Sequence, residues 1–318
     1  MLLETVKLII GLFLAIKGAD ILISSSIGLG RRFKVSDFFI GLVIVGFGTS
    51  IPELLVSVDA VLNNSANLSV GNILGSNIAN ILLVFCALGF VNNIKIKGVA
   101  PFDMLFHLSM HIIFYLVFNF STFGKKFGVL FIILFLFYII LSLRTSKDKK
   151  QIDNTDENDF FSAFTFRKPI FFSLPILFIS IAVTLFGVDL AVNSAVFISN
   201  ELNIPDSFIG LSLIAIGTSL PELVTSISAA KRGNYQIIFG NIIGSNIYNL
   251  LFILGVSSLF KFFGYNFYVL KTDVLILLIT VFIFSICLIK KLTINKKISL
   301  IFLAAYILYL INLYYRNF

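Results

Sequence analysis

The sequence predicts an all-α integral membrane protein whose ten transmembrane helices form two inverted five-helix repeats. First, 58% of the 318 residues are hydrophobic and only 13% are charged, about half the charged share of a typical soluble domain. Second, apolar runs such as 129–143 and 274–289 approach the length that crosses a bilayer. Third, much of the first half of the chain recurs in the second half.

The internal repeat is the strongest single signal. Residues 18–90 align without a gap on residues 187–259, and 25 of these 73 positions are identical. FIGLVIVGFGTSIPELL pairs with FIGLSLIAIGTSLPELV, and GNILGSNIANILL pairs with GNIIGSNIYNLLF. Self-similarity at a fixed offset indicates that both segments adopt the same structure.

Apolar segments and their flanks define the individual spans. The first span is expected to remain in the protein as a helix rather than to be removed as a signal peptide. It lacks the basic start and the small-residue cleavage site of a signal peptide. In addition, its Gly18 and Asp20 recur in the second half at Gly187 and Asp189. The ten expected spans are 4–27, 37–62, 68–91, 100–119, 126–143, 169–198, 206–230, 236–259, 273–289 and 298–315. Helices 2 and 7 are expected to be broken.

Five spans in each half put the two halves in opposite orientations. Alternate loops hold 17 lysines and arginines on one side of the membrane and 5 on the other. The positive-inside rule therefore places both termini outside the cell and the central linker in the cytoplasm. The domains are the first repeat (1–143), the cytoplasmic linker (144–168) and the inverted second repeat (169–318), an arrangement typical of transporters.

The polar linker carries four acidic residues: Asp153, Asp156, Glu157 and Asp159. Their spacing does not fit a calcium-binding EF-hand loop, because the sixth position is not glycine and the twelfth is Phe164. A solvated linker is the better interpretation. The net charge of +8 does not indicate nucleic-acid binding, because the basic residues lie in short loops between apolar segments. Cys86 and Cys287 both lie in apolar runs and give no disulfide framework.

Glu53 and Glu222 mark the candidate site, since an ionisable residue within a span indicates an ion path. Each follows a proline in the motif G-T-S-x-P-E. Proline has no N–H, so the carbonyls of Gly48 and Gly217 lose their helical partners and become candidate ligands for a hard cation. The alternative is a pair of neutral buried carboxyl groups held by neighbouring residues.

Helical spacing places further candidate ligands on the same helix faces as the two glutamates and on the spans that follow. Positions 46, 49, 50 and 53 share one helix face, as do positions 215, 218, 219 and 222. In the following spans Ser76 and Asn80 share a face, as do Ser245 and Asn249. Hydrogen bonding between helices is the rival interpretation for these four residues. Close helix packing is the interpretation for Gly71, Gly75, Gly240 and Gly244.

The paired GTSIPE and GTSLPE motifs, each followed by GN-x-x-GSN-x-x-N, resemble the alpha repeats of the Na+/Ca2+ exchanger family in the cation/Ca2+ antiporter superfamily. The resemblance covers nearly the whole chain and is closest to prokaryotic ten-helix members. It implies clustered cation sites between spans 2, 3, 7 and 8. The ligands that it implies are Gly46 (carbonyl), Thr49, Ser50, Glu53, Ser76, Asn80, Ala215 (carbonyl), Thr218, Ser219, Glu222, Ser245 and Asn249.

One position departs from the family pattern. Close prokaryotic relatives and the K+-dependent branch often have Asp where this chain has Asn249. Only two carboxylates then remain at the centre, which argues against K+ co-transport. The absence of a GN-x-x-E motif argues against the H+/Ca2+ branch.

Several other polar residues are weaker candidates for a functional role. His107 and His111 mimic half of a zinc site without a third ligand, so a metal role is not expected. Asp20 and Asp189 serve gating or the access path, or simply pair with a neighbour such as Lys17. Asp59 is interpreted as a solvated charge at the end of a span.

Two classes of function remain. The first is a secondary antiporter, with Na+/Ca2+ exchange favoured and exchange of H+ for Ca2+ or another divalent cation as the alternative. The second is a channel or a non-transporting membrane protein. Inverted repeats and a buried carboxylate pair disfavour the channel, because tight oxygen cages release ions slowly. The sequence contains no nucleotide-binding motif, so the driving force is expected to be an ion gradient. The chain is expected to be a transporter rather than an enzyme, without a cofactor. Its expected partners are Ca2+, Na+ and the lipid bilayer, with no nucleic acid, and it is expected to act as a monomer.

Overall fold

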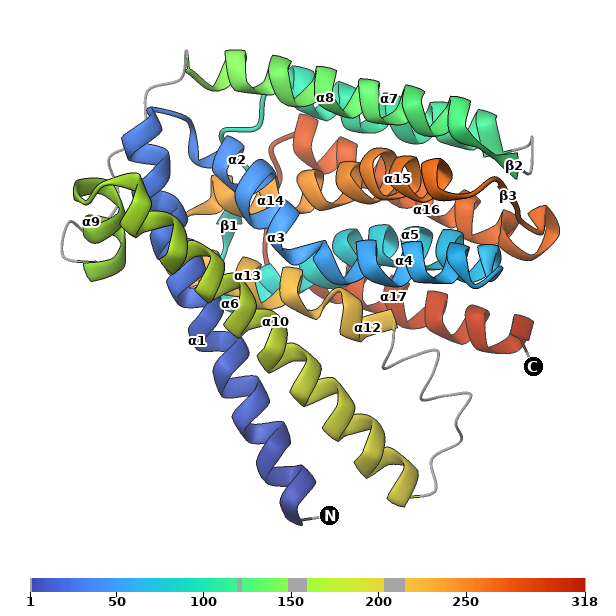
Figure 1. Ribbon diagram of the computed structural model, residues 1–318, viewed down its shortest axis with the longest axis horizontal. Helices are drawn as coiled ribbons and strands as arrows, with labels where there is room; N and C mark the ends of the chain where they lie inside the picture. Colours follow the sequence, from blue (N-terminus) through green and yellow to red (C-terminus); the bar gives the residue numbers. More distant parts are fainter. Residues whose placement is uncertain (1, 119–121, 148–158, 203–214, 318) are drawn as a thin grey trace.

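The computed structural model describes residues 2–118, 122–147, 159–202 and 215–317. In these residues the chain is helical apart from four two-residue strands (Figure 1). The elements of the first half are α1 (Leu2–Phe33), α2 (Asp37–Ile40), η1 (Gly41–Val45), α3 (Gly46–Thr49), α4 (Ile51–Leu62), α5 (Ala66–Ala79), η2 (Asn80–Val84), α6 (Phe85–Val91), β1 (Ile94–Lys95), α7 (Pro101–Phe118), β2 (Thr122–Phe123) and α8 (Lys125–Lys147).

The second half repeats this order after one linker helix. Its elements are α9 (Phe160–Arg167), α10 (Ile170–Glu201), α12 (Ala215–Thr218), α13 (Leu220–Lys231), α14 (Tyr235–Ile247), η4 (Tyr248–Ile253), α15 (Leu254–Phe260), β3 (Phe263–Gly264), α16 (Phe267–Ile289), β4 (Thr293–Ile294) and α17 (Lys296–Asn317). The η segments are π-helical turns within longer helices.

Seven helices in the described part of the chain are long and apolar enough to cross a membrane, or eight with the bent pair Asp37–Thr49 and Ile51–Leu62. The seven are Ala66–Val91, Pro101–Phe118, Lys125–Ser146, Ile170–Ile198, Tyr235–Phe260, Tyr268–Ile289 and Lys296–Arg316. The expected span 206–230 begins outside the described residues, and the count of ten spans stays a prediction. Span 4–27 corresponds to α1, which extends further at both ends.

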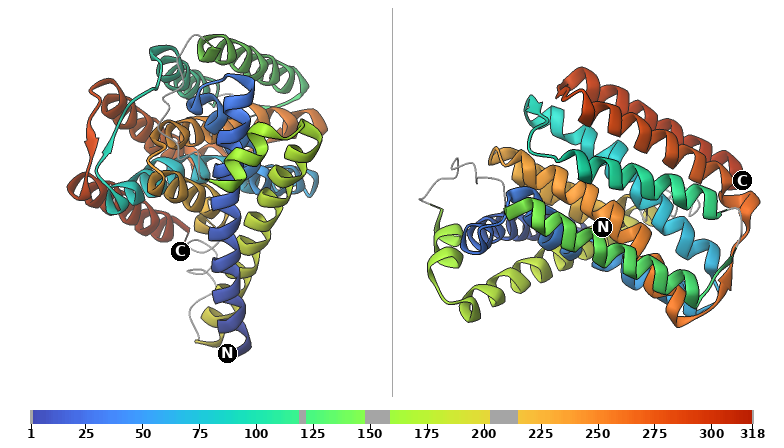
Figure 2. Two further views of the ribbon diagram at one scale, coloured as in Figure 1. Left: turned by 90° about the vertical axis from the view of Figure 1, so that its left-hand side faces the viewer. Right: turned by 90° about the horizontal axis from the view of Figure 1, so that it is seen from above.

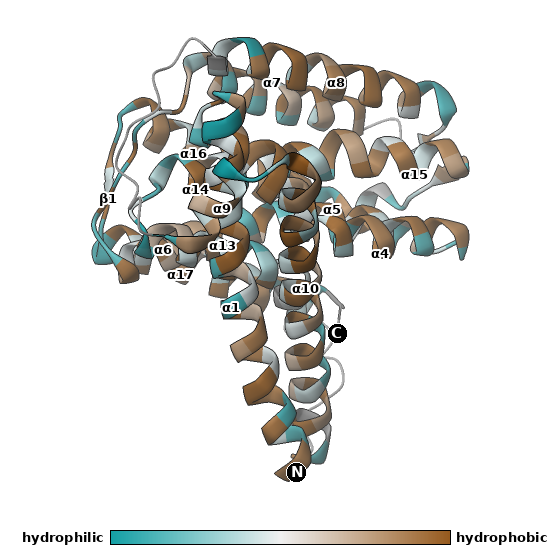
Figure 3. Ribbon diagram, turned by 60° about the vertical axis from the view of Figure 1, so that its left-hand side comes forward, coloured by the Kyte–Doolittle hydropathy of each residue, from teal (hydrophilic) through white to brown (hydrophobic). Residues whose placement is uncertain are grey.

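Two of these helices form the centre of the protein. The apolar windows of Ala66–Val91 and Tyr235–Phe260 are 78% and 94% buried, whereas those of the other five helices are at most 50% buried. The outer helices are coloured mostly as hydrophobic (Figure 3), and large apolar residues such as Leu130, Phe282 and Leu308 are exposed on them. Such surfaces suit a lipid environment.

Glycines bring the central helices into close contact. A Cβ atom at Gly240 would lie 2.1 Å from the carbonyl oxygen of Phe38, and one at Gly244 would lie 2.7 Å from that of Leu42. This agrees with the packing expected for these two glycines. Among the described residues, a Cβ atom at Gly71 would lie 3.8 Å from Leu270 Cδ2 and one at Gly75 would meet nothing within 4 Å, so close packing at these two glycines stays a prediction.

The two longest helices, α1 and α10, lie side by side and run obliquely to the other helices (Figures 1 and 2). Glycines again mark the crossing. A Cβ atom at Gly18 would lie 2.7 Å from the backbone nitrogen of Thr184, and one at Gly187 would lie 2.4 Å from that of Ala15. The first helices of the two halves are therefore packed against each other.

Two short antiparallel strand pairs join the halves, and the sequence analysis did not predict them. Ile94 pairs with Ile294 in β1 and β4, and Phe123 pairs with Phe263 in β2 and β3. The pairs lie at opposite ends of the helices (Figure 1). Two-residue strands are too short to give the alternating pattern by which strands are recognised in a sequence.

The expected linker is partly helical. Its residues 144–147 continue α8, and α9 lies within it. Asp159 caps α9 by accepting hydrogen bonds from the backbone N–H groups of Phe161 and Ser162, both at 3.1 Å. Thr165 donates to the carbonyl of Ser25 at 3.1 Å, so α9 is attached to α1. The remaining acidic residues of the linker, Asp153, Asp156 and Glu157, lie outside the described residues.

Candidate cation site

Two interruptions of the helices have nearly the same backbone conformation. Ser50 lies between α3 and α4 with φ −86° and ψ 8°, and Ser219 lies between α12 and α13 with φ −90° and ψ 2°. Pro52 and Pro221 stand two residues later. Because proline has no N–H, the preceding turn lacks one helical hydrogen bond. In the first half the two helical segments meet at an angle of 47°.

Glu53 and Glu222 begin the helices that follow these interruptions. Both side chains are 0% exposed, and each lies in the first helical turn, where the helix dipole stabilises negative charge. Neither oxygen of the Glu53 carboxylate has a hydrogen-bond partner among the described residues, and the same holds for Oε2 of Glu222. Buried carboxylate oxygens without partners are energetically unfavourable, and a cation would satisfy them.

Hydroxyl groups connect the two halves at this point. Ser50 Oγ donates to Glu222 Oε1 at 3.3 Å. Ser76 Oγ and Thr218 Oγ1 lie 3.4 Å apart. Side chains from the first half therefore reach the acidic turn of the second half, and α5 contributes a hydroxyl to the same region.

The other residues of the first G-T-S motif are also buried. Thr49 Oγ1 lies 3.1 Å from the carbonyl oxygen of Val45, its shortest acceptor contact, and 3.4 Å from Asn241 Oδ1. The carbonyl of Gly46 accepts the backbone N–H of Ser50 at 3.1 Å, and the Thr49 hydroxyl lies 3.4 Å from the same carbonyl oxygen. Ala215, the corresponding residue of the second half, begins α12.

Asn80 and Asn249 lie in the first turns of two π-helical segments. Asn80 is the first residue of η2 and Asn249 is the second residue of η4, and π-helical turns often occur at functional sites. Both are 0% exposed. Within the described residues, Oδ1 and Nδ2 of Asn80 and Oδ1 of Asn249 have no hydrogen-bond partner. Ser219 Oγ is likewise unpartnered there, whereas Ser245 Oγ donates to Asn241 Oδ1 at 3.4 Å.

Two asparagines that sequence reasoning did not single out hold the acidic turns in place. Asn72 Nδ2 donates to the backbone carbonyl of Glu53 at 3.3 Å, and Asn241 Nδ2 donates to that of Glu222 at 3.5 Å. Each also donates to the serine four residues after its glutamate, at 2.9 and 3.2 Å. Their recurrence in the GN dipeptide of both repeats was the signal that could have identified them.

The two histidines contact the asparagines of the GSN motifs. The Nδ1–H of His111 donates to the carbonyl of His107 at 2.7 Å, which leaves Nε2 as an acceptor 3.5 Å from Asn77 Nδ2. His107 Nε2 lies 3.4 Å from Asn246 Nδ2. In the part of the chain that the structure describes, no group of three or more His, Cys, Asp or Glu residues could hold a metal ion.

The aspartates outside the site differ in their surroundings. Asp20 accepts a hydrogen bond from Ser228 Oγ at 2.5 Å, which links α1 to α13. Asp59 is exposed and accepts one from Asn63 Nδ2 at 3.0 Å, as suits a solvated charge at a helix end. Asp189 is also exposed.

Comparisons with known proteins agree with the motifs. The family model described as "Sodium/calcium exchanger protein" matches residues 3–144 and 172–315. The sodium/calcium exchanger MaX1 of Methanosarcina acetivorans is 32% identical over 295 residues, which cover 80% of this chain and 82% of that protein. The inner membrane protein YrbG of Escherichia coli is 32% identical over 268 residues, covering 81% and 80% of the two chains.

A solved structure extends the similarity to the fold. The sodium-calcium exchanger NCX_Mj, in a structure soaked without Na+ and Ca2+, superposes with a TM-score of 0.82 at 31% identity. The match covers 98% of this chain and 99% of that one. The family consists of membrane transporters rather than enzymes. By the match along both repeats and by the shared fold, this chain belongs to the sodium/calcium exchanger family.

Proposed function

We propose that the chain is a secondary active antiporter that exchanges Na+ for Ca2+ across the cell membrane by alternating access. The observation that carries this proposal is the buried pair Glu53 and Glu222, with three of their four carboxylate oxygens lacking hydrogen-bond partners among the described residues. Carboxylate, hydroxyl, amide and carbonyl oxygens are the ligands that Ca2+ and Na+ prefer. Family membership supports exchange of Ca2+ for another cation, and the names of MaX1 and NCX_Mj support Na+ as that cation.

The proposed ligands are the twelve residues of the two repeats. They are Gly46, Thr49, Ser50, Glu53, Ser76 and Asn80 from the first half, and Ala215, Thr218, Ser219, Glu222, Ser245 and Asn249 from the second. The contacts of Ser50 with Glu222 and of Ser76 with Thr218 support a single site shared by both halves. Ca2+ and Na+ are the transported substrates here.

The proposed architecture is ten spans in two inverted repeats with helices 2 and 7 broken. Equivalent backbone angles at Ser50 and Ser219 support this symmetry. The strand pairs support it as well, because β1 and β3 occupy corresponding positions in the two halves and lie at opposite ends of the helices (Figure 1). The proposed orientation has both termini outside the cell and the central linker in the cytoplasm, and the proposed working unit is a monomer.

Transport is proposed to be electrogenic and independent of K+. The two central carboxylates balance one Ca2+, whereas several Na+ leave an excess of positive charge. Asn249 supplies an uncharged amide at the position where the resemblance implies an Asp in K+-dependent relatives. An inside-negative membrane potential should therefore favour Na+ influx coupled to Ca2+ efflux.

Ion flux in proteoliposomes tests the proposal. An outward Na+ gradient should drive radioactive Ca2+ into vesicles containing the purified protein, and collapse of that gradient with a Na+ ionophore should stop uptake. Uptake driven equally well by a proton gradient without Na+ would identify an H+/Ca2+ exchanger. Ca2+ flux that needs no opposing ion gradient would identify a channel.

A further inference from the structure

Six lysines gather where the β1–β4 strand pair joins the two halves. Two lie in the loop at positions 92–100 and four in the segment at positions 289–300, and neither stretch contains an acidic residue. All six side chains are exposed, and none takes part in the ion pairs found among the described residues. The six are Lys95, Lys97, Lys290, Lys291, Lys296 and Lys297.

The strand pair fixes these loops in place. Ile94 and Ile294 face each other in the pair and are 0% and 1% exposed. Because side chains alternate along a strand, the neighbouring Lys95 points to the exposed side. The nearest acid in the following helix, Asp103, is 1% exposed and accepts a hydrogen bond from Tyr138 at 3.1 Å. It is therefore directed inward, away from the lysines.

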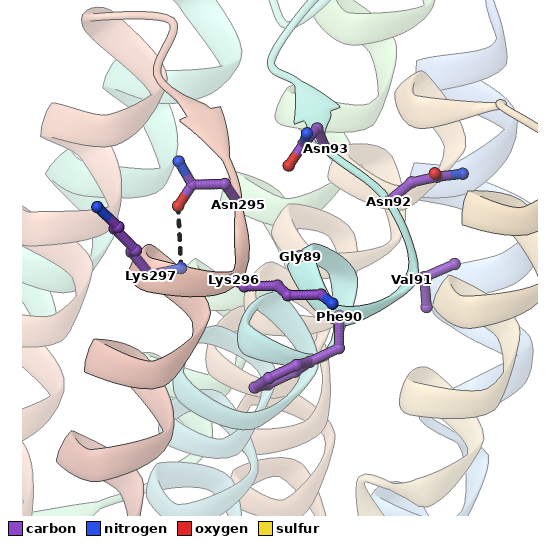
Figure 4. A pocket seen from close by; sticks show the side chains of 8 residues that line it. All are labelled: Gly89, Phe90, Val91, Asn92, Asn93, Asn295, Lys296 and Lys297. Atoms are coloured by element: carbon purple, nitrogen blue, oxygen red, sulfur yellow. Dashed lines mark hydrogen bonds between the residues drawn. The ribbon is translucent and has the colours of Figure 1, made fainter.

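A hollow of about 540 Å³ lies beside the strand pair, between the end of α6 and the start of α17. Gly89 allows these helices to approach, since a Cβ atom there would lie 2.7 Å from the carbonyl oxygen of Asn295. Lys296 extends over the hollow toward Phe90 (Figure 4). The remaining lining residues are Val91, Asn92, Asn93 and Lys297.

The hollow combines a cationic and an amide rim with an apolar wall. Phe90 is 45% exposed, and Ile289, at the end of α16, is 59% exposed. Both lie where long apolar helices end, which is the boundary between hydrocarbon and headgroups in a bilayer. A soluble anion would use the lysines and asparagines but not the apolar side chains. A phospholipid would use both.

We propose that this hollow binds the headgroup of an anionic phospholipid, with the phosphate on Lys296 and Lys297 and an acyl chain along Phe90. The other four lysines raise the local concentration of anionic lipid around the site. Clusters of lysine and arginine next to transmembrane helices recognise anionic headgroups in this way. The site is separate from the cation ligands and lies between α6 of the first half and α17 of the second.

The double variant Lys296→Gln/Lys297→Gln tests the proposal by lipid retention. Purified protein is incubated with equal amounts of phosphatidylglycerol and phosphatidylcholine in detergent, and bound lipids are counted by native mass spectrometry. Wild-type protein should retain phosphatidylglycerol selectively, and the variant should retain it about thirtyfold less tightly. The matched control is Lys125→Gln/Lys126→Gln, which removes two lysines at the opposite strand pair and should behave as wild type.

Two further arms separate the remaining explanations. Lys296→Arg/Lys297→Arg keeps the charge and should retain lipid, which shows that a loss in the Gln variant is not a folding defect. Glycerol phosphate carries the headgroup without acyl chains and should not displace the lipid. Equal retention by both Gln variants, or displacement by glycerol phosphate, would overturn the proposal. Because retention is measured without transport, the result is independent of whether the protein exchanges Na+ for Ca2+.

Discussion

Replacing the Glu53 carboxylate by an amide of the same size should abolish Ca2+ transport and leave the protein folded. Glu53 is 0% exposed, and neither of its carboxylate oxygens has a hydrogen-bond partner among the described residues. Glu53→Gln therefore breaks no hydrogen bond seen in the structure. It removes one of the two negative charges that would balance Ca2+ and places an N–H donor where the cation needs an oxygen.

The expected loss can be estimated from burial. Removing one partner from a buried pair of charges costs about 3–5 kcal/mol, because the other charge stays buried and uncompensated. Since about 1.4 kcal/mol corresponds to a tenfold change in an equilibrium constant, Ca2+ binding should weaken more than a hundredfold. The same estimate applies to Glu222, where an amide oxygen in Glu222→Gln can still accept the hydrogen bond from Ser50 that measures 3.3 Å.

The assay is Ca2+ uptake into proteoliposomes driven by Na+, normalised to the reconstituted protein. The matched control is Glu201→Gln, because Glu201 is exposed at the end of α10, and its uptake should equal that of wild type. Size-exclusion profiles and melting temperatures should be alike for all variants. Near-wild-type uptake by Glu53→Gln at low Ca2+ concentration would refute the assignment of Glu53 as a ligand.

Three other predictions follow from charge and orientation. Net positive charge should move with Na+, and moving one charge through the membrane potential contributes about 2.3 kcal/mol per 100 mV. An inside-negative potential should therefore speed Na+-driven Ca2+ export, and voltage-independent flux would contradict the charge count. Replacing K+ by choline should have no effect on this flux. A cysteine at Asn154, in protein lacking Cys86 and Cys287, should resist impermeant thiol reagents in intact cells, whereas rapid labelling would reverse the orientation. Partial burial acts to raise the pKa of the Asp159 carboxyl, but its hydrogen bonds with Ser24 and Arg232 and its ion pair with Arg232 outweigh burial and lower that pKa below its ordinary value. Asp159→Asn should therefore lower the melting temperature at pH 7, and the difference should persist at pH 4 and disappear only at lower pH, as the carboxyl becomes protonated in the folded wild-type protein.

The central parts of the site could be predicted because they depend on local chemistry. A proline removes one helical hydrogen bond from its apolar run, and the structure has interruptions at Ser50 and Ser219 beside Pro52 and Pro221. The rule is not general, because α10 continues through Pro175. The internal repeat predicts that whatever one half forms, the other half forms as well. Burial of Glu53 and Glu222 follows from their positions within long apolar segments.

Features that depend on partners distant in the sequence could not be predicted in this way. Asn72 and Asn241 act on backbone carbonyls of another helix, and nothing in the local sequence indicates which carbonyl. The contact of His111 with Asn77 depends on how α7 packs against α5. The π-helical turns that contain Asn80 and Asn249 also leave no mark on apolar periodicity.

Asn249 offers a test of how the side chain at this position affects transport, because the nitrogen and the oxygen of its amide have different surroundings. Its Nδ2 donates to Asn77 Oδ1 at 3.0 Å, while its Oδ1 has no hydrogen-bond partner among the described residues. The amide of Asn77 is fixed in turn, because its Nδ2 donates to the carbonyl of Asn246 at 3.3 Å. An aspartate at position 249 would therefore face an acceptor oxygen and could keep the hydrogen bond only in its protonated form.

Asn249→Asp should consequently change the pH dependence of transport from that of wild type. At low pH the protonated carboxyl replaces the amide donor, and Na+-driven Ca2+ flux should approach that of wild type. As the pH rises the carboxyl ionises, loses its hydrogen bond to Asn77 and adds a third negative charge that slows the release of Ca2+, so flux should fall. Asn63→Asp, at an exposed position, is the matched control and should give the same pH profile as wild type between pH 6 and pH 9. A profile for Asn249→Asp that also equals that of wild type would show that position 249 does not contact the transported ions.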